Sequence, residues 1–428
     1  MTEPLVVIAD RRIMGEIRRD RRGRLTFVYD DLWRSMDTAY PLSLSMPIVA
    51  AEHEHARIEP WLWGLLPDNQ FVLARWGQRF HVSPRNVFAL LGAVGEDCPG
   101  AIQLVRPNRV DDVMRGDGEQ IDWLTEGDVA ERLRILRNDQ AAWRMPRDTG
   151  QFSLAGAQPK TALIFDGERW GVPYGSVPTT HILKPPLDGL DGHTANEHLC
   201  LALARALGLP AARSKVRRFE DESAIIVERY DRQRRDGSIR RLHQEDMCQV
   251  LGLPPTRKYQ NEGGPGCAEL SEAIRTHSGV PGDDAWTFAC AIMLNWIIGG
   301  TDAHAKNFSM LIGASGRARL APLYDMASTL PYGFDPMKLK MATKIGGKYR
   351  LEEVLSRHWA RFATQVSLPP ADVLAMGKTM AETVPAAFDK TVADARAGGL
   401  DHPILQRMTD LVNARSKYCA RILEAPTG

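Results

Sequence analysis

The stretch TDAHAKN, residues 301–307, follows two glycines at the end of the most apolar segment of the chain, residues 286–298. It places Asp302 five positions before Asn307. Glycines after an apolar run predict that a buried helix ends there, and aspartate and asparagine favour loops. The motif is therefore predicted to lie in a loop directly after a buried helix. This loop could be a plain turn without any chemical role.

This spacing also has a chemical interpretation. Phosphoryl-transfer enzymes of the protein-kinase type carry an aspartate that accepts the hydroxyl proton and, five residues later, an asparagine that binds magnesium. The reaction needs a carboxylate beside the attacking oxygen and a neutral oxygen ligand for a hard cation. Asp302 and Asn307 supply this pair, although both residue types are common in turns.

A second carboxylate follows at a suitable distance. Asp325, within LYDM, stands 18 residues after Asn307 and beyond a β-prone run at residues 308–312. Its position suits a second metal-binding aspartate, but Met326 and Ala327 replace the phenylalanine and glycine that usually follow in kinases. An exposed aspartate that ends a strand is the alternative.

Two upstream segments carry candidate phosphate-binding groups. SLAGAQPK, residues 153–160, is rich in small residues that let backbone N–H groups approach phosphate oxygens. It matches neither standard phosphate-loop signature, so an ordinary turn remains possible. Lys184 ends the β-prone run HILK, where kinases place a phosphate-contacting lysine. Glu197 could pair with it, although TANE, residues 194–197, also fits a helix-capping box that would explain Glu197.

A possible adenine-binding segment lies between these regions. Glu228 and Tyr230 follow an apolar strand at residues 224–227, at the junction of strand-rich and helix-rich sequence. Backbone groups at such a junction could bind adenine, and an edge strand running into a hairpin is the alternative. The hairpin is predicted at residues 232–241, with Asp236 and Gly237 at its tip.

The order of predicted elements indicates an α+β fold of two lobes. Residues 1–107 form a small α/β unit with strands at 5–8 and 25–29 separated by an arginine-rich turn, and residues 108–150 form a connecting segment with a helix near 127–137. Residues 151–241 are strand-rich, and residues 242–428 are mainly helical. A ligand cleft between the two lobes is expected, since ligand sites favour domain interfaces.

Composition excludes several function classes. The net charge of +1 over 428 residues gives no overall attraction to nucleic acid or anionic membrane. The six cysteines are dispersed, which favours reduced thiols over a disulfide framework or zinc module. The N-terminus lacks a secretory pattern, and the apolar segment is too short to span a bilayer. We therefore expect a soluble cytoplasmic protein without a membrane partner. Seven arginines at residues 11–24 and five around the hairpin are either solvated faces or contacts to phosphate backbones.

Read together, the motifs resemble the HipA family of bacterial toxin kinases over nearly the whole chain. The matching blocks, in the order of the family, are FSLAGAQPKTAL (152–163), HILKP (181–185), NEHLCLALARALGL (196–209), VERYDR (227–232), LHQEDMCQVLGLPPTRKY (242–259), TDAHAKNFS (301–309) and PLYDMAST (322–329). The first 107 residues, with PLSLSMP and LLPDN, resemble the N-terminal subdomain of the family. Pro159 departs from the best-known member, which carries glutamate there, and removes a backbone donor.

The resemblance implies a two-lobed protein-kinase-like fold that binds ATP and Mg²⁺. Asp302 would be the catalytic base, while Asn307 and Asp325 would hold the magnesium ion. The nucleotide would be bound by Lys184, Glu228, Tyr230, His304 and the phosphate-loop residues Ala155, Gly156, Ala157 and Gln158. Ser153 stands where members of the family autophosphorylate, a modification that ejects the phosphate loop and inactivates the enzyme.

The resemblance also implies partners. They are a helix-turn-helix antitoxin of the HipB type, operator DNA bound mainly through that antitoxin, and a protein substrate, an aminoacyl-tRNA synthetase such as glutamyl-tRNA synthetase, whose phosphorylation inhibits translation and promotes persistence. Two other functions remain open on the sequence. One is a weakly active nucleotide-binding corepressor in an antitoxin–DNA complex, and the other is a kinase for a lipid or small molecule.

Overall fold

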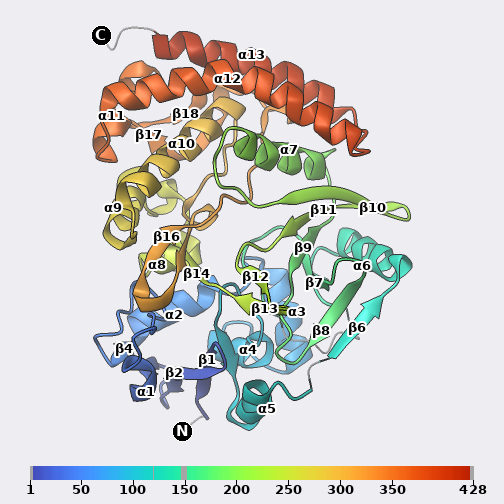
Figure 1. Cartoon of the computed structure of the whole chain (residues 1–428), viewed down its shortest axis with the longest axis vertical. Helices are drawn as coiled ribbons and strands as arrows, with labels where there is room; N and C mark the ends of the chain where they lie inside the picture. The colour runs from blue at the N-terminus through green and yellow to red at the C-terminus, as the bar shows by residue number, and fades with distance from the viewer. Residues whose placement is uncertain (1–2, 119, 146–151, 425–428) are drawn as a thin grey trace.

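The computed structural model describes residues 3–118, 120–145 and 152–424. The chain forms a mixed α+β structure in which a helical lobe packs against a strand-rich lobe and a separate N-terminal subdomain (Figure 1). This confirms the predicted fold class. Among the described residues, no helix is long and apolar enough to cross a membrane.

The N-terminal subdomain is built on a five-stranded antiparallel sheet. Its strand order is β4-β3-β2-β1-β5, with bounds Glu52–Glu54, Leu25–Tyr29, Arg12–Arg19, Leu5–Ala9 and Gln103–Val105. Helices α2 (His55–Gly64), α3 (Gln70–Phe80) and α4 (Val87–Val94) complete it, and a short helix α1 spans Asp31–Arg34. The predicted arginine-rich turn is wrong over most of its length, because β2 buries Met14 and Ile17 on the sheet and leaves Arg12 and Arg18 exposed.

The strand-rich lobe contains a six-stranded sheet. Its order is β10-β11-β9-β7-β8-β6, with bounds Ser214–Phe219, Glu222–Glu228, His181–Lys184, Thr161–Phe165, Trp170–Tyr174 and Gln120–Leu124. The segment predicted as a connection supplies β6, helix α5 (Val110–Arg115) and the predicted helix, α6 (Glu126–Asn138), which packs on the sheet. The predicted boundary between residues 150 and 151 lies outside the described residues.

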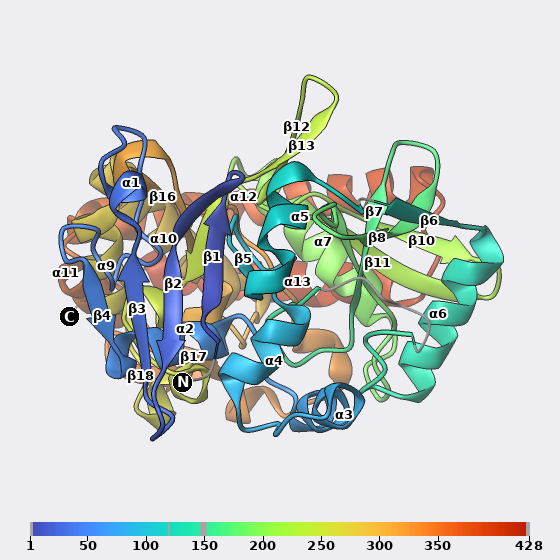
Figure 2. The same ribbon diagram turned by 90° about the horizontal axis from the view of Figure 1, so that it is seen from below.

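The hairpin is where the sequence predicts it. Strands β12 (Arg232–Arg235) and β13 (Ser238–Arg241) pair around Asp236 and Gly237, both of which have positive φ. This is the turn geometry that favours Asp-Gly. The hairpin extends away from the body of the molecule (Figure 2).

The helical lobe begins after the hairpin. Its main helices are α9 (Cys267–His277), α10 (Pro281–Ile298), α11 (Ser356–Gln365), α12 (Pro370–Ala397) and α13 (Ile404–Glu424), and α7 (His193–Ala206) packs against α12 and α13. Small sheets accompany them: β14 (His243–Asp246), β15 (Ser309–Ile312) and β16 (Ala318–Leu320) form one, and β17 (Lys340–Ile345) pairs with β18 (Lys348–Arg350). The short helix α8 (Met247–Val250) follows β14.

Helix α10 sets the position of the following loop. Its second half is buried on all sides, as the apolar sequence predicts. Gly299 ends the helix with φ 67°, and the carbonyl of Asn295 accepts hydrogen bonds from the N–H groups of Gly299 and Gly300. A Cβ at Gly300 would lie 2.2 Å from the Asn295 side-chain oxygen, so this turn requires glycine. Residues 301–307 therefore leave the core at a fixed point.

Candidate functional site

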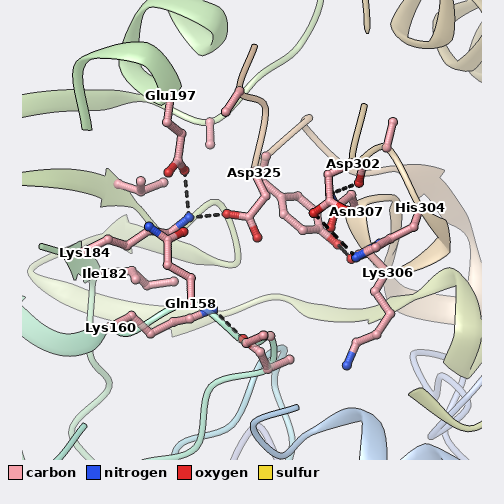
Figure 3. A pocket seen from close by; sticks show the side chains of 18 of the residues that line it. Gln158, Lys160, Ile182, Lys184, Glu197, Asp302, His304, Lys306, Asn307 and Asp325 are labelled. Atoms are coloured by element: carbon pink, nitrogen blue, oxygen red, sulfur yellow. Dashed lines mark hydrogen bonds and ion pairs between the residues drawn. The ribbon is translucent and has the colours of Figure 1, made fainter. Parts of the chain in front are cut away.

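A cavity of about 530 Å³ lies where the two lobes and the N-terminal subdomain meet. Its walls come from residues 154–160, the ends of β9 and β11, the loop after α10 and the segment after β16. Figure 3 shows side chains from these separate segments converging on one space. The cavity contains all the predicted site residues except Ser153.

Lys184 lies at the centre of one wall. Its ammonium group is 2.7 Å from the Glu197 carboxylate and also forms an ion pair with Asp325 (Figure 3). The capping-box interpretation of Glu197 is therefore wrong. Helix α7 starts at His193 after Gly192, and no side chain caps it. The structure instead supports the alternative pairing with Lys184.

The electrostatics of this trio follow from burial and proximity. Burial lowers the pKa of Lys184, but the carboxylates of Asp325 and Glu197 outweigh it and raise that pKa above its usual value. Burial raises the pKa of Glu197. Burial also raises the pKa of Asp325, yet Lys184 and Lys160 bring it below its usual value. Lys184 and Asp325 are therefore charged at neutral pH.

Asp325 occupies an unusual backbone position. Its φ is 51°, in the left-handed region that costs most residues energy but that aspartate tolerates better than most. The preceding residue fixes the segment, because the hydroxyl of Tyr324 donates to the backbone carbonyl of Lys306 at 2.7 Å. This contact joins the Asp325 segment to the loop that carries Asp302.

The loop after α10 presents Asp302 to the cavity. Its side chain is 66% exposed, and one carboxylate oxygen accepts a hydrogen bond of 2.7 Å from the hydroxyl of Tyr259. The Asn307 amide donates to the backbone carbonyl of Asp302 at 2.7 Å, so the two residues are held in one turn. Tyr259 thus fixes the orientation of the carboxylate and leaves its second oxygen open to the cavity.

His304 lies behind this carboxylate. Its Nε2 is 4.0 Å from Asp302, and its Nδ1 is buried with no hydrogen-bond partner among the described residues. Burial lowers the pKa of His304, against a smaller opposite effect of Asp302. A neutral imidazole facing the cavity can hydrogen-bond a ligand without adding charge.

The predicted phosphate loop forms the opposite wall. Gly156 has φ 99°, which only glycine adopts readily, and Lys160 closes the loop by donating to the carbonyl of Ala155 at 2.6 Å. Burial lowers the pKa of Lys160 to about 8. The amide nitrogen of Gln158 is buried without a partner among the described residues. Ala157 is exposed at the tip of the loop.

Ser153 lies behind this loop and not in the cavity. Its side chain is fully buried, and its hydroxyl donates to the carbonyl of Leu65 at 2.7 Å. Its N–H donates to the carbonyl of Asp97 at 2.9 Å. The N-terminal subdomain therefore holds this end of the predicted phosphate loop.

The predicted adenine-binding segment lines the cavity at the end of β11. The Glu228 side chain is exposed, while the ring of Tyr230 lies 5.7 Å from that of Tyr324 and its hydroxyl donates to Gln244 at 2.8 Å. Tyr230 thus contributes a flat, partly buried surface beside an exposed carboxylate.

Arginines at the base of the hairpin are not a solvated face. Arg232 and Arg241 form ion pairs with the buried carboxylate of Asp97, which Arg229 also contacts. Asp231 completes the cluster by binding Arg229 and Arg232. Arg234, Arg235 and Arg240 alone remain exposed among the five hairpin arginines. The N-terminal subdomain is thereby joined to the predicted adenine-binding segment.

The donor set fits a hard divalent cation. The Asp325 carboxylate and the Asn307 amide oxygen line the same cavity, and both are ligand types that Mg²⁺ accepts. No group of three or more histidine, cysteine or acidic side chains suited to a metal occurs in residues 3–118, 120–145 and 152–424. Two protein ligands are sufficient for Mg²⁺, since it usually keeps several waters and substrate phosphates.

Comparison with known proteins identifies the family. Residues 5–105 match the HipA N-terminal domain, and residues 152–388 match the HipA-like C-terminal domain. The chain belongs to the HipA family. This confirms the resemblance on which the sequence prediction rests.

Individual proteins with similar sequences support the assignment to this family. A putative kinase of Sinorhizobium fredii is 35% identical over 95% of this chain and 96% of its own length. The serine/threonine-protein kinase toxin HipA of Shewanella oneidensis is 27% identical over 83% of this chain and 82% of its own. Relatives named as kinases support a kinase, and kinases imply the use of ATP, generally with a metal ion.

A solved structure confirms the fold. The Shewanella oneidensis HipA in complex with HipB and operator DNA matches with a TM-score of 0.82 and 23% identity, covering 99% of this chain and all of that one. The subdomain, strand-rich lobe and helical lobe of the HipA fold are thus all present here.

Proposed function

We propose that this HipA-family chain is an ATP-dependent serine/threonine-protein kinase and the toxin of a HipBA-like toxin–antitoxin system. The observation that carries the proposal is the convergence of Lys184, Asp302, Asn307 and Asp325 on one cavity, although Lys184 is 141 positions away from Asp325 in the sequence. A corepressor without catalytic function would have no need for all four.

In the proposed reaction, Asp302 accepts the proton of the substrate hydroxyl through the oxygen that Tyr259 leaves open. The hydroxyl oxygen forms a bond to the γ-phosphorus, the bond to the bridging oxygen of ADP breaks, and ADP leaves. Bound ATP would supply the phosphoryl group, and a bound Mg²⁺ ion would offset the negative charge of its phosphates. Asn307 and Asp325 are the residues that would hold the ion, and Lys184 lowers the cost of the negative charge on the phosphates.

Other residues would orient the nucleotide. Ala155, Gly156, Ala157 and Gln158 offer backbone and amide donors to the phosphates, Glu228 and Tyr230 flank the adenine, and His304 lies beside the catalytic carboxylate. Each of these residues lines the cavity, which supports its assignment.

Autophosphorylation of Ser153 would act as an off switch. The buried hydroxyl reaches a phosphoryl donor only if the phosphate loop leaves its place against Leu65. Phosphoserine carries about 1.5 to 2 negative charges, which cannot repack into the buried site that the hydroxyl occupies. The modified loop would stay out, and nucleotide binding would be lost.

The partners of the proposed kinase follow from its family. The Shewanella protein is seen with HipB and operator DNA, and we propose a helix-turn-helix antitoxin of that kind as the partner of this chain. The net charge of +1 supports DNA contact mainly through that partner. The proposed target is a protein hydroxyl, on an aminoacyl-tRNA synthetase such as glutamyl-tRNA synthetase.

Intact-mass spectrometry after incubation with Mg²⁺ and ATP tests the proposal. Unphosphorylated wild type is expected to gain one phosphate, and both Asp302→Ala and Ser153→Ala are expected to gain none. Asp188→Ala is the matched control, since Asp188 is an exposed aspartate in a loop beside the cavity. It should behave like the wild type. No gain in wild type that binds ATP would contradict the proposed autophosphorylation, and phosphate transfer in Asp302→Ala would contradict the assigned base.

A further inference from the structure

Asp68 belongs to the N-terminal subdomain, yet it lies between the two loops of the candidate active site. It stands in the link between α2 and α3 and lines the cavity. Its backbone N–H donates to the carbonyl of Gly156 in the phosphate loop at 3.0 Å. Its carboxylate oxygens lie 2.7 Å from the ammonium of Lys306 and 2.9 Å from that of Lys258.

Both lysines belong to the machinery around Asp302. Lys306 is inside the loop itself, next to Asn307, and only 4% of its side chain is exposed. Lys258 precedes Tyr259, whose hydroxyl binds Asp302, and the Lys258 carbonyl accepts a hydrogen bond from the N–H of Ala305. A shift of either ammonium group would therefore move the Asp302 carboxylate or its support.

The charges explain why Asp68 can hold this arrangement. One carboxylate faces two ammonium groups, and the side chains of Asp68 and Lys258 are 12% and 17% exposed. Removing the carboxylate leaves two buried like charges close to each other, which repel and seek water. Burial raises the pKa of Asp68, but Lys306 and Lys258 together bring it below its usual value, so the carboxylate is charged at neutral pH.

We propose that Asp68 is a positioning residue that fixes the catalytic loop through its carboxylate and the phosphate loop through its backbone N–H. One residue of the N-terminal subdomain thus sets the distance between the loops that bind phosphate and accept the proton. The inference rests on the proposed kinase function for its effect on rate, whereas its effect on loop order is independent of that function.

The variant Asp68→Asn separates the two contacts, because it keeps the backbone N–H and the side-chain size but removes the charge. Glu352→Gln is the matched control. Glu352 forms an ion pair of 2.8 Å with Arg415 in the helical lobe, with side-chain exposures of 21% and 8%, and lies outside the cavity lining. The double variant Asp68→Asn/Lys258→Met restores the net charge of the cluster without restoring the contact to Lys306.

Three quantities are measured on the full chain: the initial rate of phosphate incorporation at saturating Mg²⁺–ATP, the dissociation constant of the non-hydrolysable analogue AMP-PNP with Mg²⁺, and hydrogen–deuterium exchange of peptides covering residues 301–309. Asp68→Asn is expected to lower the rate at least tenfold, change the dissociation constant less than threefold, and raise exchange at 301–309 at least threefold. The double variant should remain impaired, and Glu352→Gln should match wild type.

Two results overturn the inference: rate and exchange of Asp68→Asn equal to those of Glu352→Gln, or full recovery in the double variant, which would show that only charge balance matters. If wild type transfers no phosphate, the proposed function fails, but exchange at 301–309 still decides whether Asp68 holds the loop.

Discussion

Two buried clusters of charged side chains invite comparison, because one lies in the cavity wall and the other, the sealed cluster, lies at the base of the hairpin and reaches the cavity only through Arg229 and Asp231. The cavity cluster sets one ammonium against two carboxylates, and the sealed cluster sets three guanidinium groups against two carboxylates. Their members are Lys184, Glu197 and Asp325 in the first, and Arg229, Arg232, Arg241, Asp97 and Asp231 in the second. By formal charge, the first has one excess negative charge and the second one excess positive charge.

The surroundings of the two clusters distinguish a ligand-binding site from a structural contact between subdomains. In the sealed cluster, backbone carbonyls take up further donors: Arg229 and Arg232 donate to Cys98, and Arg241 donates to Ser176. In the cavity cluster one oxygen of Asp325 binds Lys184 while the other points away from it (Figure 3). A negative excess with an open oxygen suits a cation, whereas ion pairs that run from Asp97 to three arginines fix the N-terminal subdomain to the strand-rich lobe.

The largest expected effect is on stability, from breaking the sealed cluster. Asp97→Asn leaves three buried guanidinium groups with a single remaining carboxylate in the cluster. We expect the free energy of unfolding to fall by about 3–5 kcal/mol, as for other broken buried ion pairs. Urea denaturation followed by circular dichroism measures it. A loss below about 1 kcal/mol would show that the cluster does not hold the subdomain.

Changing the cavity cluster should affect catalysis and leave stability nearly intact. Asp325→Asn keeps the shape but removes a charge that the proposed reaction uses, so the initial rate of phosphate transfer should fall about 10²–10³-fold. The unfolding midpoint in urea should stay close to that of wild type, since Glu197 still pairs with Lys184. A large loss of stability with normal transfer would reverse the roles assigned to the two clusters.

The interface around the sealed cluster also predicts a pH dependence. Burial lowers the pKa of His243 to about 4, so the folded state binds its proton less readily than the unfolded chain. The stability from neutral His243 is complete above pH 6.5 and is lost as the pH falls toward 4. In His243→Gln, which can still donate to Leu42, the loss of unfolding free energy between pH 7 and 5 should be smaller by about 2 kcal/mol. Equal losses in both proteins would contradict a neutral buried histidine.

The smallest expected effect comes from an exposed arginine of the same hairpin. Arg240→Ala should change the free energy of unfolding by less than about 0.5 kcal/mol, because the side chain is exposed. The same denaturation assay checks it against Asp97→Asn. If Arg240→Ala lowered the free energy of unfolding as much as Asp97→Asn, the burial of a hairpin arginine would not determine its contribution to stability.

The sequence revealed those parts of the site that are contiguous in the chain. Asp302 and Asn307 share one turn after a glycine pair, so their spacing could be recognised in the sequence itself. The pairing of Lys184 with Glu197 was harder to predict from the sequence, because residues 194–197, TANE, also fit a helix-capping box that would explain Glu197. Local pattern favoured the cap, whereas the fold places a buried ammonium beside Glu197, and an unpaired buried charge costs far more than a missing cap.

Other contributors could not be found from local pattern. Asp68, Tyr259 and Lys160 lie inside sequence blocks that resemble the family, but nothing in their local sequence assigns their side chains a role, and Asp68 reaches Lys306 across 238 positions of sequence. Strand β2 was missed because its arginines resemble a polar turn, while the buried Met14 and Ile17 are too few to reveal the period. For Arg232 and Arg241 the sequence left a solvated face and contacts to phosphate backbones as the alternatives, whereas both side chains form ion pairs with Asp97, more than 130 residues away.

By itself, the sequence determined the α+β fold class, the hairpin, the buried helix α10 and the loop after it that carries Asp302 and Asn307, because each depends mainly on neighbouring residues in the chain. Only the tertiary structure decided which charges meet. An aspartate can be a solvated loop residue, a contact between subdomains or part of a cavity. Its role depends on the charged partners and the dielectric around it, which are set by segments that come together only when the chain folds.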